Sequence, residues 1–273
     1  MGRSFFSASN SLYPRLFQIG HFAIPTYGAL IALGLVAALA ALMQFARRMG
    51  LDPNKLWNFA VIGILTTLIS ARLLLVATAF SVFRKHPFWV LGLTASHSSW
   101  VLSVAVILGV AAAIFYALAE GLSLPRVADC IAPSSALALG ISRTGAFLAG
   151  ADYGVPVQHA FGVTYTSALA RFWYGTPLGI RLHPVQIYEA VASLLIFCAL
   201  IWWLPRRTQD GELFGIWLFL SGIAGFSLGF YRAAITGVVV RQLIFVFFVI
   251  VSAMFLLRRK SGGYTVEDDS SRN

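Results

Sequence analysis

The chain has 273 residues, of which 59% are hydrophobic and only 11% are charged, and its formal net charge is +10. Soluble domains carry about 25% charged residues, so this composition excludes an ordinary soluble protein and indicates a polytopic membrane protein. The basic residues are scattered among long apolar runs, which favours membrane topology and anionic lipid over a nucleic-acid partner.

Seven apolar runs are long enough to cross a bilayer core of about 30 Å, which needs roughly 20 helical residues. They predict helices over 25–45, 56–80, 98–119, 127–149, 186–204, 212–231 and 238–257. Between them, the short segment 86–97 is expected to be re-entrant or interfacial, and the aromatic segment 150–183 to form a small extramembrane cap. We therefore expect an all-α integral membrane protein with about seven transmembrane helices, in one membrane domain over 1–260. The polar tail 261–273 is predicted to be disordered and cytoplasmic.

The loops predict the orientation of the chain in the membrane. The loops on one side hold nine lysines and arginines, and those on the other side hold six. Cytoplasmic loops carry the excess of basic residues, so the richer side is predicted to be cytoplasmic. This places the N-terminus outside, the C-terminus inside and the 150–183 cap on the extracytoplasmic side.

Polar side chains from most of these helices fall at one predicted depth, in the outer half of the bilayer. Arg143, for example, lies 16 residues after Val127, or about 24 Å along a helix. The other residues expected at this depth are Tyr27, Arg72, His97, Gln186, Tyr188, Glu189, Arg232, Arg241 and Gln242. Charges inside a membrane are costly and usually face a cavity or a partner.

An excess of arginine over acid at this depth suggests an anionic ligand. Arg72, Arg143, Arg232 and Arg241 are predicted to meet one nearby carboxylate, Glu189, with Asp152 just outside. Guanidinium groups bind phosphate through two parallel hydrogen bonds, so the headgroup of a phospholipid is the expected ligand.

Plainer interpretations stay open for several of these residues. Arg232 and Arg241 could extend to the membrane surface, and Arg72 could pair with Glu189 instead of binding a ligand. Tyr27 could be an interfacial anchor. Three glycines permit close approach of the backbone to lipid or to a neighbouring helix. These glycines are Gly145, Gly150 and Gly154.

Four stretches resemble the prolipoprotein diacylglyceryl transferase family. "RLHPVQIYEA" resembles its His-Pro-x-Gln-x-Tyr-Glu signature, and "SRTGAFLAGADYG" resembles its arginine and glycine signature. "IPTYGAL" and "GFYR" resemble its Tyr-Gly and Phe-Phe-Arg elements. The resemblance implies seven helices with an outside N-terminus, in the bacterial cytoplasmic (inner) membrane.

The resemblance also implies a reaction. Enzymes of this family move a diacylglyceryl group from phosphatidylglycerol to the lipobox cysteine thiol of a prolipoprotein, and glycerol-1-phosphate leaves. The expected partners are therefore phosphatidylglycerol, the lipobox of the signal peptide and the bilayer. No cofactor or metal is expected, because no metal-ligand pattern is visible and the reaction needs none.

We assign roles to the candidate residues on this basis. Arg143 and Arg232 are expected to neutralise the leaving phosphate. His97 is the candidate base for the thiol, although it could instead bond to the backbone at a helix start. The substrate-binding candidates are Tyr27, Arg72, Gly145, Gly150, Asp152, Gly154, Gln186, Tyr188, Glu189 and Arg241.

Some positions depart from the family pattern. Ala146, Ala149 and Ala151 stand where the family has asparagines and a glutamate, and Asp152 is one residue away from the expected acid. Ser98 follows His97 where the family has a glycine. An alternative function is therefore a catalytically silent or altered-specificity paralogue that binds anionic phospholipid as a membrane scaffold. A transporter is disfavoured, because inverted repeats and broken helices are not evident.

Overall fold

The computed structural model describes residues 13–19, 22–80, 84, 99–158, 162–233 and 238–261. A long helix lies at each of the seven predicted places. These helices are α1 (Thr26–Arg48), α2 (Pro53–Thr78), α4 (Ser99–Ala119), α5 (Leu124–Ala149), α7 (Val185–Trp203), α8 (Glu212–Gly229) and α9 (Val238–Ser261). The predicted segment 86–97 and the tail beyond residue 261 lie outside the described residues.

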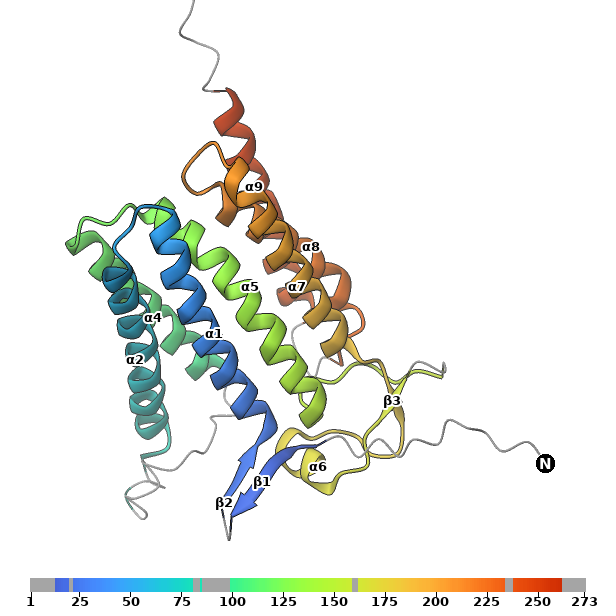
Figure 1. The fold of residues 1–273 in the computed structure, drawn as a ribbon. Helices are drawn as coiled ribbons and strands as arrows, with labels where there is room; N and C mark the ends of the chain where they lie inside the picture. Colours follow the sequence, from blue (N-terminus) through green and yellow to red (C-terminus); the bar gives the residue numbers. More distant parts are fainter. Residues whose placement is uncertain are drawn as a thin grey trace, which may run out of the picture. The chain divides into compact units, whose positions relative to one another are not determined.

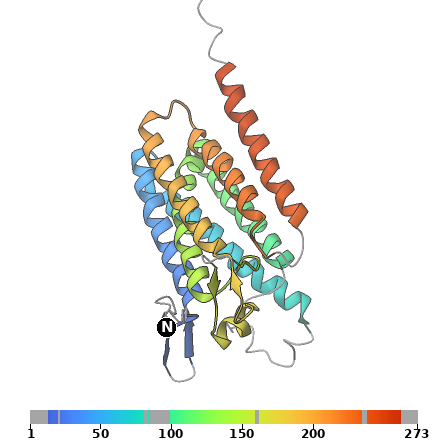
Figure 2. The same cartoon turned by 90° about the vertical axis from the view of Figure 1, so that its right-hand side faces the viewer.

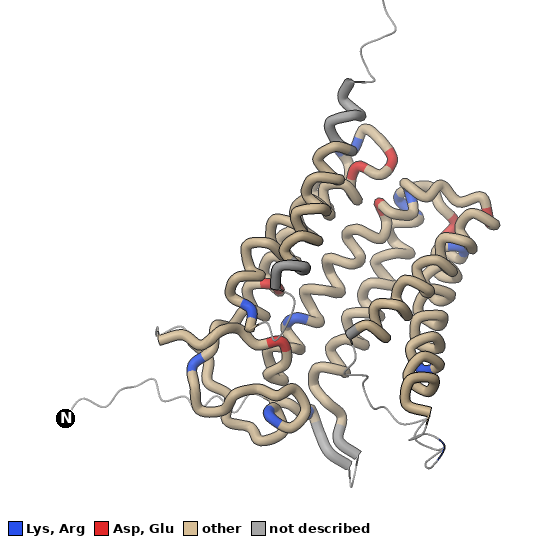
Figure 3. The backbone as a smooth tube through the Cα atoms, turned by 180° about the vertical axis from the view of Figure 1, so that it is seen from behind, with Lys and Arg blue, Asp and Glu red and all other residues tan. Residues whose placement is uncertain are grey.

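Five helices within the described part of the chain are long and apolar enough to cross a membrane. They are α1, α2, α4, α7 and α8. Many of their side chains are apolar and exposed, as a lipid-facing surface requires; Leu195 on α7, for example, is 64% exposed. Figure 3 shows charged residues mainly near the helix ends, with long uncharged stretches between them.

The chain divides into two compact units, residues 1–38 with 131–273 and residues 39–130. In the second unit, α2 lies beside α4 (Figure 1). The helices meet closely, because a Cβ on Gly109 would lie 2.6 Å from the carbonyl oxygen of Gly63. Lys55 on α2 also pairs with Glu120, just after α4, at 2.9 Å. Small residues at the contact allow helices to associate in lipid, where the hydrophobic effect does not drive them together.

In the first unit, α5 contacts both α1 and α7. A Cβ on Gly145 of α5 would lie 2.6 Å from the Cβ of Leu30 on α1, and one on Gly140 would lie 2.7 Å from the Leu194 side chain on α7. Helix α8 packs against α7 and against α9 (Figures 1 and 2). These helices bring the N-terminal ends of α1 and α7 and the C-terminal ends of α5 and α8 to the same short non-helical region (Figure 1).

That region contains short strands that the sequence did not predict. β1 (Arg15–Ile19) and β2 (Phe22–Pro25) form a hairpin before α1, and β3 (Val163–Thr164) pairs with β4 (Arg181–Leu182). A short helix, α6 (Ala168–Tyr174), lies between β3 and β4. The expected all-α fold therefore holds for the long elements, while the predicted 150–183 cap contains a small two-stranded sheet.

Candidate active site

The C-terminal end of α5 turns sharply and places an acid beside Arg143. Helix α5 ends at Ala149, and Gly150 takes a φ of 81°. Asp152 takes a φ of 53° and is the one non-glycine residue with positive φ in the described chain. Asparagine and aspartate tolerate this region better than most residues. As a result, Nη1 of Arg143 donates a hydrogen bond of 2.6 Å to Oδ2 of Asp152.

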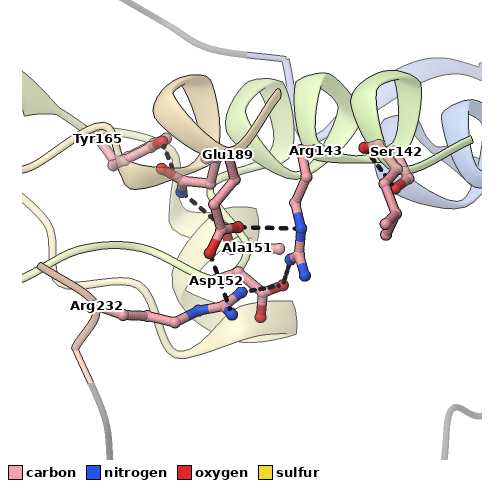
Figure 4. Close-up of polar contacts among 9 residues, drawn as sticks. Ser142, Arg143, Ala151, Asp152, Tyr165, Glu189 and Arg232 are labelled. Atoms are coloured by element: carbon pink, nitrogen blue, oxygen red, sulfur yellow. Dashed lines mark hydrogen bonds and ion pairs between the residues drawn. The ribbon is translucent and has the colours of Figure 1, made fainter. Parts of the chain in front are cut away.

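Four charged residues form a closed cluster of ion pairs (Figure 4). We call Arg143, Asp152, Glu189 and Arg232 the arginine–acid cluster. Glu189, on α7, lies 3.0 Å from Nε of Arg143 and 3.4 Å from Nη1 of Arg232. Asp152 contacts Arg143 at 2.6 Å and Arg232 at 3.0 Å through the same oxygen. Each carboxylate therefore bridges both guanidinium groups.

The cluster is electrically balanced, with two cations and two anions. The expected excess of arginine over acid also counted Arg72 and Arg241, which are not among these four residues. The turn at residues 150–152 brings Asp152, which was expected just outside, into contact with both arginines. Arg72 belongs to the other unit, on α2, and the side chain of Arg241 lies outside the described residues, as does His97.

Main-chain pairing positions Arg232. Its backbone forms an antiparallel bridge with Gly154. The N–H of Val155 donates to the carbonyl of Tyr231 at 2.9 Å, and the N–H of Ala233 donates to the carbonyl of Tyr153 at 3.3 Å. The chain that follows α8 is therefore fastened to the chain that follows α5, and both arginines reach the same carboxylates.

Gln186 anchors the turn that carries Asp152. It is fully buried, and its Nε2 donates a hydrogen bond of 2.7 Å to the carbonyl of Ala151. Glu189 lies three residues later, so one face of α7 contacts both the turn and the arginines. A second anchor is Thr176, whose hydroxyl donates to the carbonyl of Gly150 at 2.8 Å.

Tyr165 closes the same region from the cap. Its hydroxyl donates to the carbonyl of Phe147 at 3.1 Å and accepts a 3.4 Å hydrogen bond from Gln186. Burial raises the pKa of Tyr165 to about 12, so the phenol stays protonated and remains a donor at physiological pH.

Tyr27 lies at the start of α1 and within electrostatic range of all four charged side chains of the cluster. Its ring meets that of Tyr174, at the end of α6, edge to face with centroids 6.0 Å apart. Sequence reasoning selected Tyr27 and missed Tyr174. The aromatic run "RFWY" in the predicted cap was the available signal, but it does not indicate which ring faces the site.

The glycine candidates face protein. A Cβ on Gly145 would meet Leu30, one on Gly150 would meet the ring of Tyr165 at 3.0 Å, and one on Gly154 would lie 2.5 Å from the carbonyl oxygen of His183. Of the two alternatives, these contacts support close packing of protein segments.

Tyr188 makes an aromatic contact with His183, with ring centroids 6.4 Å apart, and His183 contacts Tyr231 at 5.1 Å. This aromatic group adjoins Arg232 through Tyr231. In the part of the chain that the structure describes, no group of three or more histidine, cysteine or acidic residues could hold a metal ion.

Known proteins resemble this chain over most of its length. It is 29% identical over 219 residues to the phosphatidylglycerol–prolipoprotein diacylglyceryl transferase of Clostridium tetani, over 80% of this chain and 85% of the relative. It is 28% identical over 253 residues to the protein of the same name from Oceanobacillus iheyensis, over 89% and 86%. The corresponding Clostridium kluyveri protein is 26% identical over 261 residues, 93% of this chain and 99% of the relative.

The prolipoprotein diacylglyceryl transferase family model matches residues 14–258. This match includes every residue of the arginine–acid cluster as well as α1, α5, α7 and α8. The chain belongs to the prolipoprotein diacylglyceryl transferase family.

Proposed function

We propose that this protein transfers a diacylglyceryl group from phosphatidylglycerol to the lipobox cysteine thiol of prolipoproteins and releases glycerol-1-phosphate. The observation that carries the proposal is the convergence of two guanidinium groups, those of Arg143 and Arg232, on shared carboxylates. Family membership and the names of the relatives support the same activity.

The reaction exchanges one bond at a glycerol carbon. The cysteine thiolate attacks the carbon of the diacylglyceryl group that carries the phosphodiester, so a C–S bond forms and a C–O bond breaks. The electron pair of the C–O bond leaves with glycerol-1-phosphate, and the thiol proton passes to a base. Because negative charge builds up on the leaving phosphate, preorganised cations at that position lower the barrier.

The residues take the following roles in this proposal. Arg143 and Arg232 bind the phosphate and stabilise its departure. His97 accepts the thiol proton, because its ordinary pKa near 6.5 suits a base at neutral pH. Tyr27 and Glu189 orient the headgroup or the guanidinium groups.

The remaining candidates have supporting roles. Gln186 and the glycines Gly145, Gly150 and Gly154 shape the site, and Tyr188 borders it. Arg72 and Arg241 are proposed as further cations for the headgroup. This last assignment rests on their predicted depth in the outer half of the bilayer.

We further propose that seven helices span the bacterial inner membrane, with the N-terminus outside and the C-terminus inside. The nine-to-six bias of basic loop residues supports this orientation. It places the 150–183 cap and the arginine–acid cluster on the extracytoplasmic side, where secreted precursors emerge.

A second candidate is a paralogue that binds anionic lipid without transfer. Two observations favour it: the cluster is electrically balanced, and the polar positions of the family signature are occupied by Ala146, Ala149 and Ala151. All three alanines are buried, so they line no polar surface that could orient a substrate.

One experiment separates the two candidates. Purified protein in detergent is mixed with a lipobox peptide and dioleoyl-phosphatidylglycerol, and thioether formation is followed by the mass increase of the peptide. The proposal predicts modification at the cysteine and none on a cysteine-to-serine peptide. Binding of phosphatidylglycerol without peptide modification would favour the silent paralogue.

A further inference from the structure

One oxygen atom joins the two arginines of the cluster. Oδ2 of Asp152 lies 2.6 Å from Nη1 of Arg143 and 3.0 Å from Nη2 of Arg232. Glu189 contacts the same two residues with two separate oxygens, at 3.0 and 3.4 Å. A phosphate oxygen that bridges Nη1 of Arg143 and Nη2 of Arg232 would therefore take the place that Asp152 Oδ2 holds.

Charge favours this exchange. With Asp152 in place, the four side chains of the arginine–acid cluster carry no net charge, and each guanidinium group is paired with both carboxylates. When Asp152 turns away, the two arginines and Glu189 carry a net charge of +1, which matches the single negative charge of a phosphodiester. A phosphate monoester carries about −1.5 to −2 at neutral pH and exceeds that match.

Of the two carboxylates, Asp152 is the one that can leave. Its side chain is 41% exposed, whereas that of Glu189 is 17% exposed and extends from the body of helix α7. The backbone around Asp152 is held by the hydrogen bonds of Gln186 to Ala151 and of Thr176 to Gly150. The Asp152 carboxylate can therefore rotate about its side-chain bonds towards solvent while the turn stays in place.

We propose that Asp152 is an internal competitor for the phosphate site. It releases both guanidinium groups when the phosphodiester of the lipid binds, and it returns to them when the phosphate monoester leaves. Asp152 is then a specificity-determining residue that sets how tightly substrate and product are held, and it touches no reacting atom. This inference rests on the proposed function in one respect, namely that Arg143 and Arg232 bind phosphate.

The test compares wild type with Asp152→Asn by equilibrium binding, which requires no transfer reaction. Two probes are used in phosphate-free buffer: free glycerol-1-phosphate, and nanodiscs that contain phosphatidylglycerol, with phosphatidylcholine nanodiscs as the blank. Asparagine keeps the shape of the side chain and accepts positive φ, but it does not carry the competing charge. We expect Asp152→Asn to bind both probes about tenfold more tightly, within the usual range for two coupled binding events.

Two controls complete the design. Asp210→Asn removes a carboxylate from the Arg207–Asp210 pair, at 3.8 Å, and should leave both affinities unchanged. Asp152→Gly also accepts positive φ and should tighten binding in the same way, which guards against a folding defect peculiar to asparagine.

The proposal is wrong if both Asp152 variants bind either probe with unchanged or weaker affinity than wild type. Weaker binding would mean that Asp152 holds the arginines in place and does not compete with phosphate. The proposed function fails in a different way. In that case Arg143→Ala and Arg232→Ala leave phosphate binding intact, or the wild type binds phosphatidylglycerol and does not modify the lipobox peptide.

Discussion

Arg232 and Gly154 are neighbours through their main chains, and this pairing determines where the Arg232 guanidinium lies. The carbonyl of Val155, in the same segment, accepts a hydrogen bond of 3.0 Å from the N–H of His183. Segments from three regions of the chain therefore meet beside Gly154.

Gly154→Ala should disrupt this meeting point. The added Cβ would lie 2.5 Å from the backbone oxygen of His183, which cannot move as a flexible side chain could. Overpacking of this kind costs about 1–3 kcal/mol, and we expect a lower melting temperature in detergent together with loss of transfer. Gly28→Ala is the control for the melting temperature, because its Cβ would meet only a side-chain carbon of Pro25 at 3.4 Å, an ordinary contact. Equal melting temperatures for the two variants would contradict the expectation.

Arg143→Lys should lose most transfer activity while the protein still folds. Arg143 contacts Glu189 through Nε and Asp152 through Nη1, and a single ammonium group cannot reproduce this geometry. Loss of one preorganised contact to the developing charge costs about 3–4 kcal/mol, or a hundredfold or more in rate, and Arg143→Ala should lose nearly all activity. Peptide modification is the measurement.

The matched control is Arg171→Lys, on the exposed surface of α6, which should keep wild-type activity. A near wild-type rate for Arg143→Ala, with normal elution from a sizing column, would rule out a role for Arg143 in the reaction.

Gln186→Leu should destabilise the protein through the turn at Ala151. The substitution leaves the carbonyl of Ala151 without its 2.7 Å hydrogen bond in a buried place, at a cost of about 1–3 kcal/mol. Thermal unfolding in detergent measures the effect, with Gln158→Leu on the exposed cap surface as the control. If Gln186→Leu melts at the wild-type temperature, the turn does not depend on this bond.

Tyr174 should support Tyr27 through its ring rather than its hydroxyl. Tyr174→Phe keeps the edge-to-face contact and should retain activity within about twofold, whereas Tyr174→Ala removes a ring pair worth about 0.5–1.5 kcal/mol. We therefore expect Tyr174→Ala to lose about two- to tenfold in kcat/KM. Equal losses in both variants would show that the hydroxyl matters instead.

Cysteine labelling should reveal the orientation of the chain. In a background free of Cys130 and Cys198, Gln158→Cys in the cap should react with a membrane-impermeant reagent in intact cells with an opened outer membrane. Gln209→Cys, in the loop between α7 and α8, should react only after lysis. Both positions are exposed, so the absence of labelling reports the side of the membrane. If Gln209→Cys reacts in intact cells and Gln158→Cys reacts only after lysis, the predicted orientation is wrong.

Hydropathy predicted the positions of the helices well, because apolar length is the property that a bilayer requires. It predicted the ends less well. Helix α2 begins at Pro53, three residues before the expected start, since the side chain of Asp52 accepts a 2.8 Å hydrogen bond from the N–H of Asn54. Helix α1 continues through Arg47 to Arg48, beyond the apolar run. Arginine has a high helix propensity, and each residue added to a helix that has already formed gains one backbone hydrogen bond.

The sequence predicted which residues lie close together better than it predicted the contacts between them. The depth argument placed Arg143, Glu189 and Arg232 at one level, and the structure brings these three together. It could not predict that Asp152 contacts both arginines, because that depends on two successive deviations to positive φ, at Gly150 and Asp152. The Tyr27–Tyr174 contact likewise depends on how the cap folds back over α1.

The segment 153–157 is held by hydrogen bonds between peptide groups, from the N–H of Val155 to Tyr231, from the N–H of Val157 to Arg181 and from the N–H of His183 to Val155. Peptide groups are the same in every amino acid except proline. Substitutions along this segment should therefore keep its main-chain link to Arg232, provided that Gly154 is kept. The backbone position from which the Arg232 side chain extends can thus stay constant while the side chains of the segment change.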